Sequence, residues 1–492
     1  MTEIEIKLQV PAPSRDAVAR ALHRGRVSRM RLAARYFDTP DRRLAAAGLV
    51  LRLRREGRRW VQAIKGAGDG PLERLEHEAR IAASSSRDAP PLDLARHDGT
   101  PEGRALRRAL GDDGADALAL CFATDVQRTR REVRLGATRI ELSFDEGVLR
   151  AGDGRTLPVC ELELELLQGP LAPMVALASR WAGRHGLWFD ARSKAERGQW
   201  LADGAAEAPV AKVKQPTIRR HAAPDAALRE GVRSALSQLA ANASWLAAGS
   251  LQAEHVHQAR VGLRRVRSLL REFGDWSEEV DARWLETARE VFGQLSAARD
   301  RDALAEWLWP RLHEAGAPPF ALEAAADAVD PAAVLRAATT TQWLLDMLAF
   351  AHAPAADDDA APRADLRTLA RRPLARLHRQ VHRAGRAFDT LDEAARHRAR
   401  KRLKRLRYAA EALSSLWPAA AWAAYLRRLR DAQDALGRLQ DIAVAEPMLR
   451  DAAAREPGAA FGLGYIAARR GEFVADAGRA LAAIGKLPAF LR

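Results

Sequence analysis

Cysteine is almost absent from this chain, in which Cys121 and Cys160 are the only two among 492 residues. Two cysteines are too few for a disulfide framework or for a thiolate metal site. Long apolar runs are missing too, and no uncharged stretch approaches the ~20 residues that cross a bilayer. Glu3 and Glu5 stand where a secretory leader would need basic residues. We therefore expect a cytoplasmic protein with no membrane-spanning segment.

Tyrosine is also scarce, and acidic residues do not balance the basic ones. The net charge of +15 implies a polyanionic partner, which can be nucleic acid, a phosphate polymer or anionic lipid. With 4 tyrosines in the whole chain, no array of stacking aromatics is interleaved with the basic stripes. Nucleic acid is therefore the less favoured partner.

Two regions of different composition follow one another along the chain. Residues 1–202 carry the alternation of polar and apolar side chains that is typical of strands. Residues 203–217 contain a glycine and two prolines and are predicted to form a linker. Residues 218–490 are rich in alanine, leucine and arginine, and we expect them to be entirely helical. The predicted fold class is therefore α+β.

The first region holds eight predicted strands and three predicted helices. The strands span residues 2–9, 33–38, 49–56, 58–66, 72–81, 124–135, 137–145 and 158–168. The helices span residues 14–24, about 101–110, and 171–186. Because short connections join most strands, we expect an eight-stranded antiparallel β-barrel, which leaves no sheet edge exposed.

Charged side chains recur at alternate positions of these strands. In the opening strand, Glu3, Glu5 and Lys7 share one face, opposite Ile4 and Ile6. The later strands repeat the pattern with Arg52, Arg54, Lys65, Glu76, Glu78, Arg128, Arg130, Glu141, Asp145, Glu161, Glu163 and Glu165. A solvated sheet face does not need acids and bases recurring in pairs on strand after strand. A charged interior is costly unless a ligand and ions compensate it, and a metal-bound chain of phosphates would do so.

Several of these motifs together resemble those of one known family, the CYTH domains or triphosphate tunnel metalloenzymes. The motifs are Glu3-Ile4-Glu5-Ile6-Lys7, Tyr36-Phe37-Asp38-Thr39-Pro40, Leu51-Arg52-Leu53-Arg54, Ile64-Lys65, Glu76-His77-Glu78, Arg128-Thr129-Arg130 and Cys160-Glu161-Leu162-Glu163-Leu164-Glu165. The resemblance covers roughly residues 1–202. The pair Ser193-Lys194, with the attached helical half, resembles the inorganic triphosphatase branch of bacteria.

The resemblance implies an eight-stranded tunnel that hydrolyses a triphosphate with Mg²⁺ or Mn²⁺. The residues it assigns to the triphosphate are Lys7, Arg52, Arg54, Lys65, Arg128, Arg130 and Lys194. The residues it assigns to metal are Glu3, Glu5, Asp145, Glu163 and Glu165, and Glu76 and Glu78 join Glu3, Glu5 and Lys7 as catalytic residues. Which of Glu161, Glu163 and Glu165 touches metal stays open, because all three share one face.

A second pattern occurs twice in the helical region. His257, Arg260, Arg264, Arg267 and Arg271 are three or four residues apart, which places them on one face of a helix. The same spacing returns in His397, Arg400, Lys404 and Arg407, and Leu295 to Asp300 is echoed by Leu436 to Asp441. Like charges at these spacings cost helix stability, so we infer a ligand. We expect two helical repeats, about residues 218–352 and 363–490, divided by a linker, Pro354–Pro362, that contains three aspartates.

These repeated motifs resemble the CHAD domain, a duplicated all-helical unit. The resemblance covers residues 218–490 and implies binding of long-chain polyphosphate along a basic surface. The residues expected at that surface are His257, Arg260, Arg264, Arg265, Arg267, Arg271, His378, His382, His397, Arg400, Lys401, Lys404 and Arg407. The histidines also suggest a metal site, but the interleaved arginines would repel a cation.

The sequence therefore predicts a metal-dependent inorganic triphosphatase joined to a polyphosphate-binding domain, in the cytoplasm and associated with polyphosphate granules. Three alternatives stay open: a polyphosphate-binding protein whose tunnel is inactive or acts as a sensor, a thiamine triphosphatase, and an adenylate cyclase. The sequence leaves a homodimer open. It also does not decide whether the helical domain feeds, tethers or regulates the tunnel.

Overall fold

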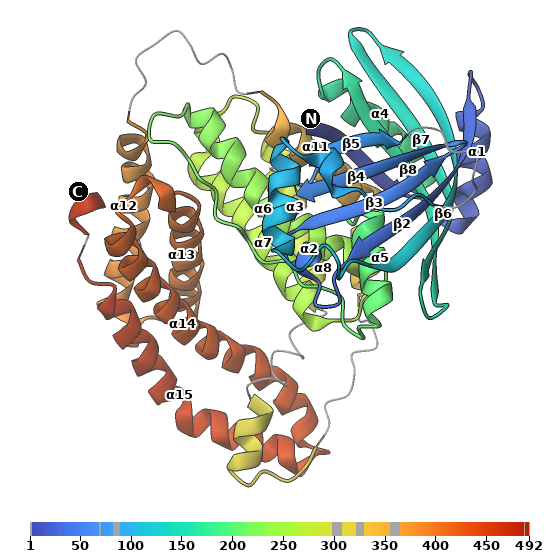
Figure 1. The fold of residues 1–492 in the computed structure, drawn as a ribbon. Helices are drawn as coiled ribbons and strands as arrows, with labels where there is room; N and C mark the ends of the chain where they lie inside the picture. Colours follow the sequence, from blue (N-terminus) through green and yellow to red (C-terminus); the bar gives the residue numbers. More distant parts are fainter. Residues whose placement is uncertain are drawn as a thin grey trace. The chain divides into compact units, whose positions relative to one another are not determined.

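The computed structural model describes residues 2–67, 70–81, 89–297, 308–320, 329–354, 365–486 and 488–491 (Figure 1). They fall into two compact units. Unit 1 comprises Met1–Ala211, Ala240–His255 and Leu335–Ala353, and unit 2 comprises Lys212–Leu239, Val256–Val334 and Pro354–Arg492.

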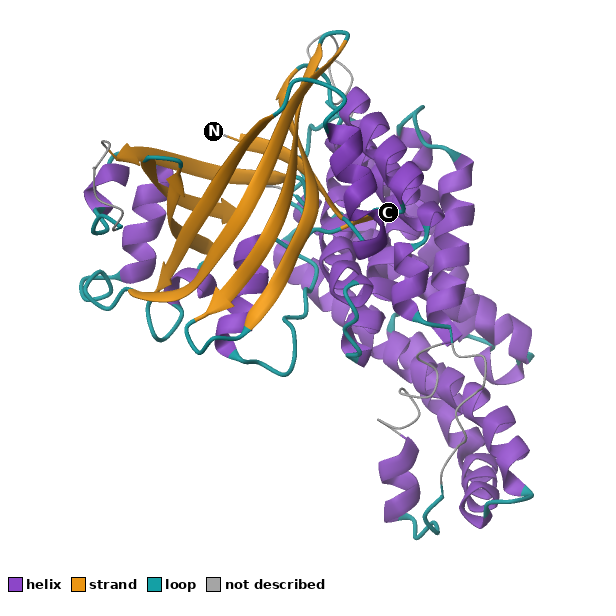
Figure 2. Ribbon diagram, turned by 90° about the vertical axis from the view of Figure 1, so that its right-hand side faces the viewer, coloured by secondary structure: helices purple, strands orange, loops and turns teal. Residues whose placement is uncertain are grey.

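Unit 1 contains one antiparallel sheet of nine strands, which curls strongly (Figure 2). The strands are β1 (Thr2–Gln9), β2 (Ser28–Asp38), β3 (Leu49–Glu56), β4 (Arg59–Ala67), β5 (Glu73–Ile81), β6 (Ala119–Leu135), β7 (Thr138–Ala151), β8 (Thr156–Gln168) and β9 (Trp188–Phe189). Their order is β5-β4-β3-β2-β6-β7-β8-β1-β9. The α+β class predicted from the sequence is confirmed.

The two ends of this order meet only along a short seam. Glu5 to Gln9 of β1 pair with β8, while Thr2 to Ile4 pair with β5. The description "eight-stranded barrel" is therefore loose: β9 adds a ninth strand beside β1, and the seam between β1 and β5 is three residue pairs long.

Helices lie against both faces of the sheet. Those of unit 1 are α1 (Arg15–Leu22), α2 (Arg43–Ala46), α3 (Pro101–Leu110), α4 (Ala172–His185), α5 (Lys194–Asp203) and α11 (Ala338–His352). On the outer face, the apolar positions of the alternating pattern are buried, and Leu51 and Ile64 pack with Leu106 and Leu110 of α3. The three helices expected in this region correspond to α1, α3 and α4.

Helix α5 closes one end of the inner face of the sheet. Its start is fixed by a capping box, in which the Ser193 hydroxyl accepts from the Glu196 backbone N–H and the Glu196 carboxylate accepts from the Ser193 N–H. Leu201 of α5 packs against Val126 of β6 in an apolar cluster. Gly198 lets the helix approach so closely that a Cβ there would lie 2.1 Å from the Phe122 ring.

The remaining helices form the bundle of the second half. They are α6 (Pro224–Ala247), α7 (Ala253–Phe273), α8 (Ala282–Ala297), α10 (Pro331–Arg336), α12 (Leu366–Gly385), α13 (Glu393–Ala412), α14 (Ala419–Ala453) and α15 (Pro457–Ala483). Along α7, the apolar residues three and four apart, Val256, Ala259, Leu263, Val266 and Leu270, are all buried. No helix in the described ranges has the length and apolar character needed to cross a membrane.

The two basic motifs lie on helices with similar endings. The first lies on α7 and the second on α13, and each helix ends in a short 3₁₀ turn, Gly274–Trp276 after α7 and Ser414–Leu416 after α13. Parts of two predicted features lie outside the described residues. They are Arg299-Asp300 of the second repeated motif and residues 355–362 of the linker between the predicted repeats.

The close approach of α5 to β6 gives a prediction for stability. Gly198→Ala forces a methyl group into the Phe122 ring, and we expect it to lower the free energy of unfolding by about 1–3 kcal/mol. Gly183→Ala in α4 is the matched control, because nothing lies within 4 Å of the added Cβ. It should be neutral or should stabilise by up to about 1 kcal/mol. Chemical denaturation followed by circular dichroism checks both, and equal behaviour of the two variants would contradict the close contact.

Candidate functional site

The charged positions of the strands share the inner, concave face of the sheet. Arg52 of β3 donates to Glu76 of β5 at 3.2 Å, although β4 lies between these strands. Arg128 of β6 likewise contacts Glu163 of β8, with β7 between them. Side chains on the outside of a curved sheet diverge, so contacts that skip a strand place these groups on the inside. The charged side chains therefore line the concave face of the sheet, as the strand pattern predicted.

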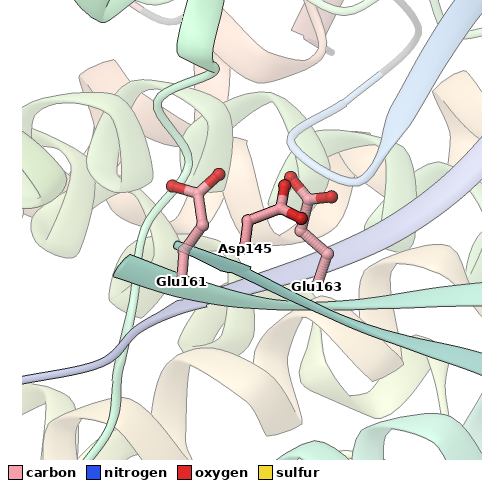
Figure 3. A group of neighbouring side chains, drawn as sticks. All are labelled: Asp145, Glu161 and Glu163. Carbon is pink, nitrogen blue, oxygen red and sulfur yellow. The ribbon is translucent and has the colours of Figure 1, made fainter. Parts of the chain in front are cut away.

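A cluster of three carboxylates lies where α5 meets this face: Asp145 of β7 and Glu161 and Glu163 of β8 (Figure 3). Each offers an oxygen within 4.8 Å of the others. The ammonium of Lys194, at the first turn of α5, pairs with all three, at 2.6 Å from Asp145 and 2.7 Å from Glu163. Arg128 binds both oxygens of Asp145, at 2.7 and 2.6 Å.

Burial and charge act against each other in this cluster. Burial alone would raise the pKa of Glu163, but Lys194 and Arg128 hold the pKa of this carboxyl well below its usual range. Burial also disfavours the charged amine of Lys194, yet Asp145, Glu161 and Glu163 outweigh it and raise the pKa of Lys194. Glu163 and Lys194 are therefore ionised and paired, and cations of the protein lie against all three carboxylates of the cluster.

Farther from α5, carboxylates of neighbouring strands face one another, and in the described part of the chain only Glu3 and Glu141 among them pair with a cation, Lys65 and Arg130 respectively. Glu5 of β1 lies directly opposite Glu165 of β8, which lies opposite Glu141 of β7. Neither Glu5 nor Glu165 forms an ion pair with any residue that the structure describes. Burial, followed by the charges of Glu141 and Glu5, raises the pKa of Glu165. Burial, partly offset by Lys65, raises the pKa of Glu3 to about 8.

This carboxylate row has the donor chemistry that Mg²⁺ and Mn²⁺ prefer, because such ions take oxygen ligands. Lys65 pairs with Glu3 and Arg130 pairs with Glu141, but Glu5 and Glu165 face each other across neighbouring strands. A divalent cation would relieve the repulsion between these two carboxylates. Among the described residues, the carboxylates that lie close enough together to share an ion are Asp145, Glu161 and Glu163. Glu3, Glu5 and Glu165 offer suitable donor oxygens, and their role as metal ligands stays a prediction. Asp145 and Glu163, which were predicted as ligands too, are held by Lys194 and Arg128 in this structure.

Glu76 and Glu78 hold the neighbouring cations in place. Glu76 pairs with Lys65 at 2.8 Å and with Arg52 at 3.2 Å. Glu78 pairs with Arg52 at 3.3 Å and with Arg54 at 3.2 Å. Burial would raise the pKa of Glu76, but Lys65 and Arg52 lower it to about 2. These two glutamates contact bases, so they orient the cations of the site.

The other predicted cations lie on the same face. Lys7 is buried, 4% exposed, and lies opposite Glu163 in the strand register. Arg130 pairs with Glu141 at 2.7 Å. The structure thus brings every site residue predicted in the first half of the chain to one face, sorted so that the paired cluster lies at α5 and the carboxylate row lies beyond it.

Three residues of this region were not predicted from the sequence. Arg197 pairs with Glu161, and Gln9 donates to Glu161 at 3.1 Å and to Asp190 at 2.9 Å. The spacing of Lys194 and Arg197, one helical turn apart, was the available signal for Arg197. Asp190 lies in a connection with no repeating pattern, so its sequence carried no comparable signal.

A basic cluster lies on the bundle of unit 2. The guanidinium groups of Arg260, Arg264 and Arg267 lie over the Phe292 ring, at 5.1, 4.7 and 5.8 Å from its centroid. Burial, reinforced by Arg264 and Arg400, holds the pKa of Lys404 well below its usual range, although Asp441 opposes the shift. Basic residues from both predicted motifs are therefore gathered in one place.

The other predicted residues of this half lie in different settings. Arg265 and Arg407 pair with Glu411 at 2.8 and 2.6 Å. His378 is buried and shares a hydrogen bond of 2.9 Å with the Tyr425 hydroxyl, and His382 stacks on it. His397 bonds to Gln440 at 3.0 Å. The remaining three are the half-buried His257 and the exposed Arg271 and Lys401. His378 is thus enclosed in the bundle, whereas the arginines over Phe292 form the cluster.

A curled antiparallel sheet with a sorted, charged inner face, followed by a helical domain, defines a two-module protein. Residues 1–174 match the model of the CYTH domain. Residues 230–450 match the model of the CHAD domain. The chain therefore combines a CYTH domain with a CHAD domain, as its motifs predicted.

Among known proteins, the chain is similar to an inorganic triphosphatase of Haemophilus influenzae, with 28% identity over 168 residues. The similarity covers 34% of this chain and 44% of that relative, so it spans less than half of the relative's length. The CHAD domain from the plant Ricinus communis is 24% identical, with a TM-score of 0.47, over 57% of this chain and 98% of that one. HpAC1 from Hippeastrum, described as having a dominant triphosphatase activity, is 20% identical over 41% of this chain and 96% of that one, with a TM-score of 0.31.

Two arginine–aspartate pairs of identical geometry give a prediction. Arg128 binds buried Asp145 on the inner face, and Arg31 binds Asp125 at 2.7 and 2.6 Å on the outer face, where its side chain is 72% exposed. Arg128→Ala leaves the buried carboxylates of Asp145 and Glu163 without one of their cationic partners. We expect this variant to lower the free energy of unfolding by about 3 kcal/mol. Arg31→Ala should leave stability unchanged, because water replaces the lost pairing. Chemical denaturation of both variants checks this prediction. Equal losses in the free energy of unfolding would show that burial does not determine how much an arginine–aspartate pair contributes to stability.

Proposed function

We propose that this chain hydrolyses inorganic triphosphate to pyrophosphate and phosphate on the inner face of its sheet, with Mg²⁺ or Mn²⁺. The observation that carries the proposal is the sorting of charge on that face. Cations lie beside a row of carboxylates, and this matches a polyanion that carries its own divalent cation. The similarity to an inorganic triphosphatase over 168 residues supports the same conclusion.

The cations would bind the phosphate oxygens. They are Lys7, Arg52, Arg54, Lys65, Arg128, Arg130 and Lys194. Arginine suits this task because its planar fork can bind two oxygens at once. Glu76 and Glu78 would hold Lys65, Arg52 and Arg54 in position, as they do in the structure.

Glu3, Glu5 and Glu165 would hold the metal ion, with Asp145 and Glu163 at the other end of the face. When bound, the ion supplies neutralisation of the phosphate charge and a lower pKa for water. Water attacks the terminal phosphorus, the bond to the bridging oxygen breaks, pyrophosphate leaves, and the proton of the attacking water passes to solvent. Phosphoryl transfer needs mainly positioning and charge neutralisation, which these residues supply.

Hydrolysis and its metal dependence can be tested on the full chain with a matched pair of variants. Phosphate release should be greatest from triphosphate, compared with thiamine triphosphate and ATP, and should stop in EDTA. Glu5→Gln should lower turnover about 100-fold or more, because it weakens the metal site. Glu146→Gln is the control, since Glu146 pairs with Arg15 on the outer face. Full activity of Glu5→Gln, or faster turnover of an organic triphosphate, would contradict the proposal.

The bundle of unit 2 favours a second function, binding of long-chain polyphosphate. The supporting observation is the cluster of Arg260, Arg264 and Arg267 over Phe292, together with Lys404. Like charges at this density are unfavourable for the bundle alone, and a polyanion would stabilise them. The charge pattern suits a repeating phosphate chain, because the basic groups recur along two helices.

Polyphosphate binding should weaken steeply with salt, because each neutralised phosphate releases counterions. Arg264→Gln should reduce the slope of log affinity against log salt by about 0.7. Arg283→Gln is the control, because this exposed arginine of α8 pairs with Asp281 instead. Fluorescence anisotropy of labelled polyphosphate measures the slope. Binding that does not change with salt, or that DNA displaces as well as polyphosphate does, would contradict the assignment.

A further inference from the structure

A continuous set of contacts connects the paired cluster of the inner face to the end of helix α6. It begins at Glu161, which is fully buried and binds Lys194 and Arg197 of α5. Gln9 of β1 donates from one amide nitrogen to Glu161 and to Asp190. One glutamine therefore fixes the relative positions of these two carboxylates.

Asp190 continues the connection toward α6. It is 1% exposed, and its two oxygens accept from Nε and Nη2 of Arg192 at 2.9 and 2.8 Å. The Arg192 guanidinium lies 4.7 Å from the centroid of the Trp245 ring of α6. Beside it, the backbone N–H of Ala191 donates to the Ser244 hydroxyl of α6 at 2.8 Å. The segment 190–192 is thus held from both sides.

Trp245 also touches α5 directly. Its ring meets the ring of Trp200 edge to face, with centroids 5.4 Å apart. Trp200 and Lys194 belong to the same short helix. Two sets of contacts therefore connect Trp245 to Lys194, one through α5 and one through Arg192, Asp190, Gln9 and Glu161. All of these residues belong to unit 1.

We propose that Asp190 and Arg192 are positioning residues which, with Trp245 and Ser244 of α6, hold Lys194 and Arg197 in place on the inner face. Trp245 and Ser244 lie inside the segment that matches the CHAD domain, whereas the sheet belongs to the segment that matches the CYTH domain. The charge cluster of the CYTH domain is thus completed by a helix of the CHAD-matched segment. The expected effect on turnover rests on the proposed triphosphatase function, but the positioning of Lys194 does not.

The test measures Lys194 directly in the full chain. Acetylation by a small anhydride, quantified for each lysine by peptide mass spectrometry, reports how often each amine leaves its partners. Trp245→Ala should raise the rate at Lys194 about tenfold, as expected when local opening becomes easier by about 1.4 kcal/mol. The rate at Lys65, at the far end of the same face, should stay unchanged. Trp245→Phe keeps an aromatic ring for Arg192 and should restore most of the protection.

Asp190→Asn provides a second, nearly isosteric route to the same result, should Trp245→Ala fail to fold. It removes the charge that orients Arg192, and it should also raise acetylation of Lys194 and lower kcat/KM for triphosphate about tenfold. Trp422→Phe is the control, because Trp422 is a buried aromatic of unit 2 outside this network.

Two results would overturn the inference. One is unchanged protection of Lys194 in folded Asp190→Asn, and the other is an equal rise at Lys65 and Lys194, which would show general loosening. If the unaltered chain releases no phosphate from triphosphate, the proposed function fails. The acetylation pattern then still decides whether the network positions Lys194.

Discussion

The constraint on which the rest of this structure depends is the cost of enclosing ionised side chains on one face of a curled sheet. Such groups lose their water, so each must find a partner in the protein or in a ligand. The chain meets this requirement unevenly. Around Lys194 and Arg128, the carboxylates of Asp145 and Glu163 are fully paired, so that end of the face is stable without a guest. Farther along, carboxylates face one another across neighbouring strands. That imbalance is the physical basis of the proposal that the face binds a cation and, through the cations beside it, a polyanion.

Helix α5 links this electrostatic arrangement to the packing of the domain. Its capping box fixes where the helix begins, and Lys194 occupies the first turn, so the cap also fixes the position of the ammonium among the carboxylates. Gly198 lets the helix settle against Phe122, and Leu201 seals the apolar end of the inner face. The same ten residues therefore supply both charge and closure. A change in the packing of α5 necessarily moves a cation of the site.

The boundary between the two modules is less simple than the composition of the chain indicates. The motifs and the family matches divide the chain into a first, strand-rich part and a second, helical part. The two compact units of the structure divide it differently, because Ala240–His255 and Leu335–Ala353 belong to unit 1 together with the sheet. The two divisions assign the end of α6 differently. Its sequence belongs to the CHAD-matched segment, whereas its residues belong to unit 1. An apolar and aromatic helix end next to the sheet can support charged residues that the sheet alone would hold less firmly.

The sequence by itself determined which side chains share a face, because that follows from the local geometry of a strand or helix. Alternation placed Glu3, Glu5 and Lys7 on one face of their strand and Glu161, Glu163 and Glu165 on one face of theirs, and the spacing of three and four residues placed the arginines of α7 on one side. The seam between β1 and β5, the ninth strand, the burial of His378 and the network through Asp190 were decided only by the tertiary structure. Glu161 and Glu163 show the reason: they are alike in sequence, yet Glu161 meets Gln9 and Arg197 whereas Glu163 meets Arg128. Partners contributed by distant segments distinguish the two, and a local pattern contains no information about which distant segments meet.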